Sequence, residues 1–252
     1  HYSDGLLVDP HMSFLGIAHR GASGRAPENT HAAFAAALNL GAEAVELDCQ
    51  LSADGELVVI HDETLDRTTD GHGPVGDRSA AELARLDAGS WFGAEYRGER
   101  IPRLADVLAQ LRDRVTLNIE IKSAHDLGVI EPKLAALIVA ERAAEWVVFS
   151  SFHPEGLRNL RAAAPWARLG VLCDQDPLAG GLALATELGA EFLIPGRRWV
   201  DSGVIATAHA RGLDVWVWTV NEPGEMRRLI ALGVDAIFSD YPERFSGLVA
   251  IS

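Results

Sequence analysis

Short apolar runs alternate with amphipathic segments along most of this sequence, and this alternation constrains the fold more than any other feature. Nine apolar runs are expected to be strands, at residues 15–18, 44–50, 57–60, 116–121, 147–150, 169–172, 192–194, 214–219 and 236–238. Helical patterns lie near residues 30–40, 104–113, 126–143, 155–163, 178–188, 201–211, 223–232 and 242–250. Repeated strand–helix alternation indicates parallel strands joined by crossover helices.

Two architectures can hold such an alternation. If residues 57–60 form a hairpin with the preceding strand, eight strand–helix units remain, which predicts an α/β fold of the (β/α)8 TIM-barrel type. An open doubly wound sheet is the alternative. No glycine-rich phosphate loop follows the first strand, so the nucleotide-binding form of that alternative is disfavoured.

Residues 62–103 interrupt the rhythm with about 40 residues that contain no long helical or strand pattern. Loops of this length in compact domains are usually functional or ordered as a small subdomain. We therefore expect a single barrel domain over residues 12–252 with an insertion at about 62–103. Residues 1–11 are polar and irregular, and we interpret them as a tag or vector remnant that precedes Met12.

The charge balance excludes some classes of partner. Acidic residues outnumber basic ones by 36 to 22, which gives a formal charge of −14. This field opposes nucleic acid and anionic membrane surfaces but allows a small anionic substrate beside a local cation. No apolar run approaches the roughly 20 residues of a membrane span, and no signal peptide is visible. We expect a cytoplasmic protein without stable membrane anchoring, and a homo-oligomer is compatible with the sequence.

Strand parity places three acids together. Glu46 and Asp48 share one face of their strand, and Glu120 lies on the corresponding face of the strand at 116–121. Because the helix-facing side of a barrel strand must be apolar, these acids are expected to point into the barrel or its mouth. Converging carboxylates require a cation, and an all-oxygen set suits Ca²⁺ or Mg²⁺. Lys122 is an alternative source of that positive charge.

Two histidines follow strands that would be neighbours in the barrel. His19 and His61 could therefore flank the acidic cluster, and a hydroxyl group between them could lose a proton to one ring and gain a proton from the other. Arg20, next to His19, could fork two donors onto a phosphate. Each histidine or acid taken alone is also compatible with a purely structural role.

Several short motifs, taken as a set, carry a family resemblance. They are His19-Arg20-Gly21, Pro27-Glu28-Asn29-Thr30, Glu46-Leu47-Asp48, His61-Asp62, residues 65–71 (Leu-Asp-Arg-Thr-Thr-Asp-Gly), residues 118–122 (Asn-Ile-Glu-Ile-Lys) and residues 217–221 (Val-Trp-Thr-Val-Asn). With these motifs the chain resembles the glycerophosphodiester phosphodiesterase family from residue 14 to residue 245.

The resemblance implies a (β/α)8 barrel with a small inserted subdomain and one divalent metal ion, Ca²⁺ or Mg²⁺. It also implies roles for named residues. The metal ligands would be Glu46, Asp48 and Glu120; the catalytic residues would be His19, His61 and Arg20; and the substrate-binding residues would be Arg20, Glu28, Asn29, Lys122 and Trp218. Trp218 could instead be a plain core tryptophan.

The implied reaction is metal-dependent hydrolysis of a glycerophosphodiester to sn-glycerol 3-phosphate and an alcohol, with the two histidines as general acid and base. One alternative is a phospholipase D-type enzyme that acts on lysophospholipids or sphingomyelin. Another is a barrel that binds phosphodiesters without turnover. The sequence leaves open the alcohol, the choice between the two metals, which histidine is the acid, and the oligomeric state. It also leaves open whether water attacks directly or the substrate's own 2-hydroxyl attacks and forms a cyclic phosphate.

Overall fold

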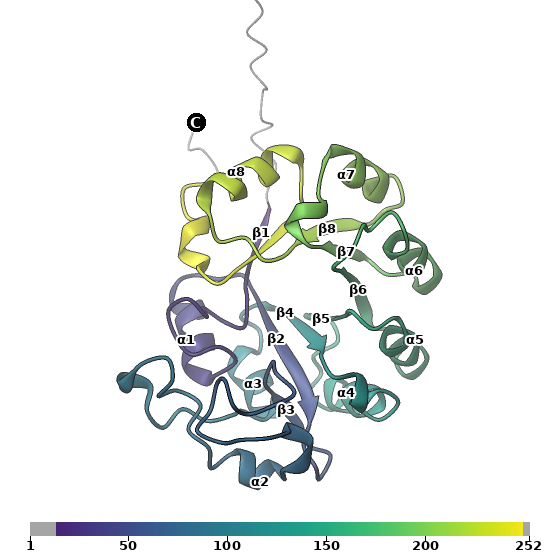
Figure 1. The fold of residues 1–252 in the computed structure, drawn as a ribbon. Coiled ribbons are helices and arrows are strands. Elements are labelled where there is room, and N and C mark those ends of the chain that lie inside the picture. Colours follow the sequence, from purple (N-terminus) through teal and green to yellow (C-terminus); the bar gives the residue numbers. More distant parts are fainter. Residues whose placement is uncertain (1–13, 249–252) are drawn as a thin grey trace, which may run out of the picture.

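The computed structural model describes residues 14–248, so the residues interpreted as a tag lie outside the described part. Eight parallel strands close into a barrel with helices around it (Figure 1), which confirms the predicted TIM barrel. The barrel strands are β1 (Leu15–Ala18), β2 (Ala44–Leu51), β4 (Thr116–Ile121), β5 (Val147–Ser151), β6 (Arg168–Cys173), β7 (Phe192–Pro195), β8 (Asp214–Val217) and β9 (Ala236–Ser239). β1 pairs with both β9 and β2, which closes the barrel. The remaining strand, β3 (Leu57–Val59), is not part of the barrel wall and forms an antiparallel hairpin with β2, as expected.

The helices between the strands lie on the outside of the barrel. They are α1 (His31–Asn39), α3 (Leu104–Leu111), α4 (Ile130–Ala140), α5 (Pro154–Ala163), α6 (Gly181–Leu188), α7 (Ser202–His209) and α8 (Pro223–Leu232). Where residues 242–250 were predicted to be a helix, the described residues form a single 3₁₀ turn, Pro242–Phe245, so this prediction is wrong for them. The physical reason is tertiary: the Phe245 ring packs edge-on against Phe14 at 5.7 Å, beneath β1.

The two faces of the barrel strands have different neighbours. On β2 and β4 the apolar residues pack with the surrounding helices in the main hydrophobic core, as Leu47 and Ile119 do. A second, smaller cluster fills the barrel and includes Ile17, Phe192 and Trp216. The polar residues of β2 and β4 are thereby turned toward the barrel interior and its mouth.

The register between β2 and β4 places the acids at two successive levels of one face. Glu46 pairs with Asn118, and Asp48 pairs with Glu120. Because side chains opposite each other on adjacent strands share a face, the acids of the two strands meet without any loop having to bend toward them. The fold therefore builds this part of the site on rigid backbone.

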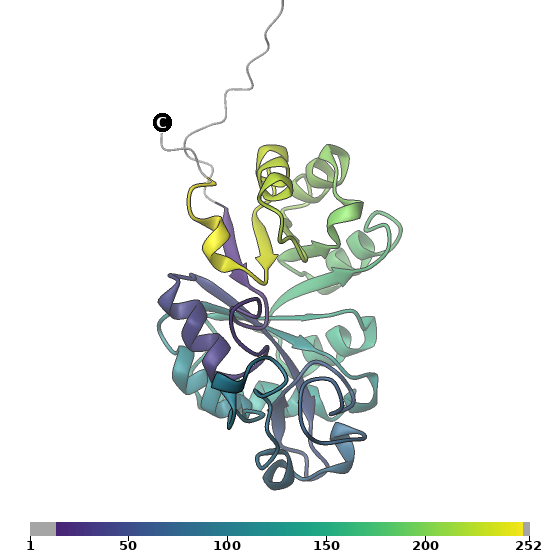
Figure 2. The same cartoon turned by 60° about the vertical axis from the view of Figure 1, so that its left-hand side comes forward.

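The segment at residues 62–103 packs around a small apolar cluster of its own. It contains the short helix α2 (Ala80–Leu83), and Leu65, Val75 and Leu83 are buried together with Ile60 next to β3. Figures 1 and 2 both place this segment at the side of the barrel beside β3. Within residues 14–248, no helix combines the length and apolar character that a membrane crossing needs.

The loop between β1 and α1 contains a glycine with no room for a side chain. Gly21 has a φ of +76°, and a Cβ atom there would lie 2.7 Å from the carbonyl carbon of Ala33. Gly41, after α1, has a nearly identical φ of +77° but open space around it. Both positions favour glycine on backbone grounds, and only at Gly21 does packing add to the constraint.

This pair gives a matched prediction. Gly41→Ala should lower the free energy of unfolding by about 1 kcal/mol, because only the left-handed backbone is penalised. Gly21→Ala should lower it by roughly 2–4 kcal/mol, because a steric clash is added, and it should also reduce activity by displacing Arg20. Urea unfolding of both variants measures the difference. Equal losses of stability would contradict the close approach to Ala33.

Candidate functional site

Three acidic side chains from neighbouring strands meet at the barrel mouth. Glu46 and Asp48 lie on β2 and Glu120 lies on β4, and one oxygen atom from each lies within 4.8 Å of the other two. All three are buried. Within the described residues, Glu46 Oε1 and Asp48 Oδ1 accept no hydrogen bond. Buried carboxylate oxygens without partners fit a bound cation, because an unpaired buried charge is costly.

Burial and repulsion also perturb the protonation of this cluster. Burial, followed by the negative charge of Asp48, raises the pKa of Glu46 well above its usual range and raises that of Glu120 to about 7. Burial pushes the pKa of Asp48 upward too, but nearby positive charges, with Arg20 foremost, leave it lowered. A bound divalent ion would keep all three carboxylates ionised at neutral pH.

Arg20 and Lys122 bring positive charge to the acids. Lys122 Nζ donates a hydrogen bond to Glu120 Oε1 at 2.9 Å and lies 3.9 Å from Asp48 Oδ1. Arg20 Nε lies 3.3 Å from Asp48 Oδ2, and its backbone N–H donates to Glu46 Oε2 at 2.9 Å. These contacts support the alternative in which Lys122 supplies positive charge to the acids. The lysine nevertheless leaves Glu46 Oε1 without a partner.

Both predicted histidines reach the same pocket, and each is held by a carboxylate. His19 Nδ1 lies 2.7 Å from Asp240 Oδ1, and His61 Nδ1 lies 2.6 Å from Asp62 Oδ1. Because an ionised carboxylate only accepts hydrogen bonds, Nδ1 carries the proton in each pair. The Nε2 atoms are then left for chemistry in the pocket, and His19 Nε2 lies 4.0 Å from Glu46 Oε2.

The partner of His19 was missed in the sequence. Asp240 follows β9 and also accepts hydrogen bonds from Ser23 Oγ at 2.9 Å and from Asn221 Nδ2 at 2.7 Å. A signal for it existed, because Asp240 directly follows a strand and active-site residues of barrels lie at strand carboxyl ends. Its pairing with a histidine 221 positions away in the sequence could not be predicted.

Arg67, in the inserted segment, bridges the two sides of the site. It donates to Asp62 Oδ2 at 2.7 Å through Nε and to Glu28 Oε2 at 2.9 Å through Nη1. Glu28 in turn accepts a hydrogen bond from Arg20 Nη1 at 2.9 Å. One guanidinium thus connects the residue that holds His61 with the residue that holds Arg20. Arg67 lies in one of the motifs that carry the family resemblance, and the sequence alone did not indicate its role.

Glu28 and Asn29 lie behind the pocket rather than on its wall. Asn29 Nδ2 donates to Asp48 Oδ2 at 2.8 Å, and Glu28 contacts Arg20 and Arg67. Neither residue lines the cavity that contains the two histidines. Their contacts hold Asp48 and Arg20 in place, and the expectation that they bind substrate stays a prediction.

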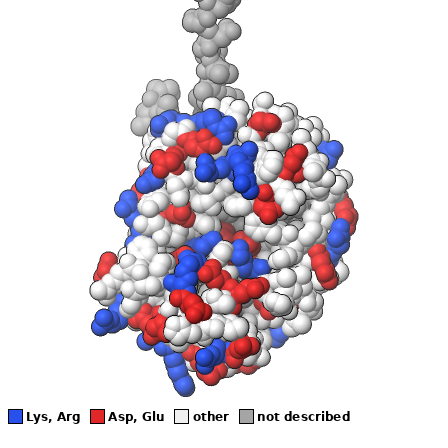
Figure 3. All heavy atoms as spheres, viewed as in Figure 1, with Lys and Arg blue, Asp and Glu red and all other residues white. Residues whose placement is uncertain are grey.

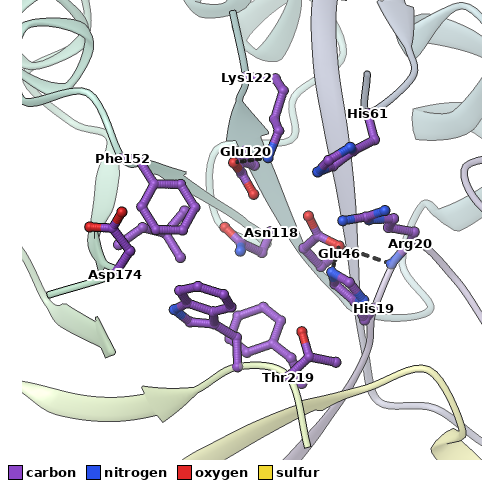
Figure 4. A pocket seen from close by; sticks show the side chains of 13 residues that line it. His19, Arg20, Glu46, His61, Asn118, Glu120, Lys122, Phe152, Asp174 and Thr219 are labelled. Carbon is purple, nitrogen blue, oxygen red and sulfur yellow. Dashed lines mark hydrogen bonds and ion pairs between the residues drawn. The ribbon is translucent and has the colours of Figure 1, made fainter. Parts of the chain in front are cut away.

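The pocket is a cavity of about 280 Å³ with one polar side and one apolar side. Figure 4 shows the histidines, Arg20 and Glu46 on one side of the pocket and Phe152 with Asp174 on the opposite side. Trp218 also lines the pocket, and its role in substrate binding stays a prediction. Its ring meets Phe152 edge to face at 5.2 Å, and its Nε1 donates to the Ile194 carbonyl at 3.0 Å. On the surface, acidic and basic side chains lie together around a hollow (Figure 3).

The fold and this pocket define the class of protein: a TIM-barrel enzyme with a buried acidic cluster, able to hold a metal ion, beside two histidines. The model of the glycerophosphoryl diester phosphodiesterase family matches residues 19–244. A glycerophosphodiester phosphodiesterase from Caldanaerobacter subterraneus is 43% identical over 240 residues, which cover 94% of this chain and 98% of that protein.

Solved structures agree. A glycerophosphodiester phosphodiesterase from Agrobacterium tumefaciens superposes with a TM-score of 0.83 at 35% identity, covering 92% of this chain and 99% of that one. A phosphodiesterase from Oleispira antarctica, solved with the product sn-glycerol-3-phosphate, gives 0.85 at 34% identity, covering 93% and 96%. The chain belongs to the glycerophosphoryl diester phosphodiesterase family, an enzyme family of phosphoric diester hydrolases, which confirms the resemblance.

The bridging position of Arg67 leads to a prediction. Arg67→Ala should lower kcat by roughly 10–100-fold, because the groups that orient His61 and Arg20 lose their common partner. Arg67→Lys should recover part of the lost kcat, since lysine restores the positive charge but cannot donate to Asp62 and Glu28 with the geometry of a guanidinium. Arg85→Ala removes an exposed arginine from the same segment and should leave kcat unchanged. Wild-type kcat in Arg67→Ala, measured on any hydrolysed diester, would show that the bridge does not matter.

Proposed function

We propose that this chain hydrolyses glycerophosphodiesters to sn-glycerol 3-phosphate and an alcohol, with one divalent metal ion and with His19 and His61 as the proton-transfer groups. The observation that carries the proposal is the meeting of both histidines, Arg20 and the acidic cluster at one pocket. The product bound in the Oleispira antarctica relative supports sn-glycerol 3-phosphate as the product.

The metal would be held by Glu46, Asp48 and Glu120. Their all-oxygen donor set suits Ca²⁺ or Mg²⁺, and their unpartnered oxygens and raised pKa values support such a ligand role. When bound, the ion would act as a Lewis acid that withdraws charge from a phosphoryl oxygen.

Arg20 and Lys122 would hold the phosphate. Both line the pocket and both are already fixed by carboxylates, so little side-chain entropy is lost when an anion binds. Arg20 can present two parallel donors, and Lys122 adds a point charge. This pair favours an anionic substrate in a chain whose overall charge is strongly negative.

The two histidines would move protons at the reacting atoms. Asp240 and Asp62 orient the rings, so that each Nε2 can face the pocket. Burial, with the positive charge of Arg20 as a further cause, lowers the pKa of His61 and favours its neutral form. We therefore assign His61 as the base that takes a proton from the attacking hydroxyl. His19 would give a proton to the departing alkoxide of the alcohol.

The two alternative functions find less support. A phospholipase D acting on lysophospholipids needs a wide apolar entrance, and Trp91 and Phe92, which could have formed one, do not line the pocket. A barrel that binds without turnover would be expected to lack a histidine or an acid, and all are present. Turnover of glycerophosphocholine compared with lysophosphatidylcholine separates the first alternative from the proposed reaction.

A release assay tests the proposed function. The protein should release glycerol 3-phosphate from several glycerophosphodiesters, should stop after treatment with EDTA, and should recover when Ca²⁺ or Mg²⁺ is restored. Turnover that persists after complete removal of divalent ions would contradict the metal requirement.

The role of His61 predicts a large loss on substitution. His61→Ala should lower kcat by at least about 10²-fold, because one proton-transfer group is removed, while the melting temperature changes little. His72→Ala, which removes an exposed histidine from the inserted segment, should leave kcat unchanged. Near wild-type turnover in His61→Ala would argue strongly against the assignment.

A further inference from the structure

The apolar side of the pocket carries one acid that the proposed mechanism does not use. We propose that Asp174, with Phe152 and Trp218, forms a subsite for a positively charged amino-alcohol head group, so that diesters of such alcohols are the favoured substrates. This inference rests on the proposed function and deepens it, because it names the class of leaving alcohol.

Asp174 lies on the side of the pocket away from the reacting groups. Among the described residues that line the cavity, the carboxylates are Glu46 and Glu120 on the polar side and Asp174 on the other side, just beyond β6. In Figure 4 Asp174 lies beside Phe152, away from His19 and Arg20. It is therefore placed to meet the part of a substrate that projects away from the phosphate.

The carboxylate of Asp174 is exposed and available to a ligand. Its backbone carbonyl accepts hydrogen bonds from Trp199 Nε1 at 2.9 Å and Arg198 Nη2 at 3.4 Å, which fix the main chain. Its carboxylate forms no hydrogen bond or ion pair with any residue between 14 and 248. Arg198 stacks on Trp199 instead and does not line the cavity. The negative charge thus remains open to a ligand.

The wall around Asp174 is aromatic and apolar. Phe152 and Trp218 meet at 5.2 Å next to Asp174, and Leu172 and Phe238 complete an apolar surface. Aromatic faces with a nearby carboxylate are the surroundings that proteins use for ammonium and quaternary ammonium groups. The Lys122 ammonium already lies 5.7 Å from the centroid of the Phe152 ring.

The size of the cavity links this wall to the phosphate. The cavity has a volume of about 280 Å³. When Arg20 and Lys122 hold the phosphate in it, an ester substituent of that phosphate would face the aromatic wall. A short amino alcohol would bring its positive charge to Asp174. A neutral polyol would offer hydroxyl groups to the same wall without any charge to pair with Asp174.

The test compares charged and neutral head groups in matched variants. In Asp174→Asn, kcat/KM for glycerophosphocholine and glycerophosphoethanolamine should fall by roughly three- to tenfold, mainly through KM, because one partly exposed charge pair is lost. For glycerophosphoglycerol it should change less than about twofold. Asp176→Asn makes the same change two residues away, at a position that does not line this cavity, and should leave both classes unchanged.

Binding provides a readout that does not depend on turnover. Calorimetry should show that Asp174→Asn weakens phosphocholine but leaves glycerol 3-phosphate binding as in the wild type. Equal effects on charged and neutral ligands, or no effect on either, would overturn the subsite. If the wild type released no glycerol 3-phosphate from any diester, the proposed function would fail, and the binding comparison would still decide for or against the cation subsite.

Discussion

The repulsion among three buried carboxylates is the constraint on which the rest of this site depends. Glu46, Asp48 and Glu120 are brought together by the register of β2 and β4, and two cationic side chains, Arg20 and Lys122, offset them only in part. Such a cluster is costly in an otherwise apolar barrel. A bound divalent ion would offset the repulsion among the carboxylates, and the same ion would take part in the proposed reaction.

The other contacts of the site form an outer layer that holds these groups in place. Asp240 and Asp62 orient the histidines, and Asn29 fixes Asp48. Arg67 joins the inserted segment to the barrel mouth. The insertion has little regular secondary structure, yet through Arg67 it contributes directly to the geometry of the barrel mouth.

Much of this arrangement could be predicted because it follows from local periodicity. Alternation along residues 44–50 and 116–121 placed the acids on one face, and strand–helix alternation indicated the barrel. The pairing of His19 with Asp240 could not be predicted in this way, because it joins the first and last strands. The turn at Pro242–Phe245 replaced a predicted helix because Phe245 packs beneath β1, a contact that no local pattern encodes.

Calorimetric titration of the metal-free protein with Ca²⁺ and with Mg²⁺ tests whether Glu46, Asp48 and Glu120 hold a divalent ion. We expect one ion per chain for the wild type, and an affinity lowered by at least roughly 100-fold in Glu46→Gln, because one of three carboxylate ligands is lost. Absence of binding to the wild type, or equal affinity in the variant, would contradict the claim that these carboxylates form a metal site.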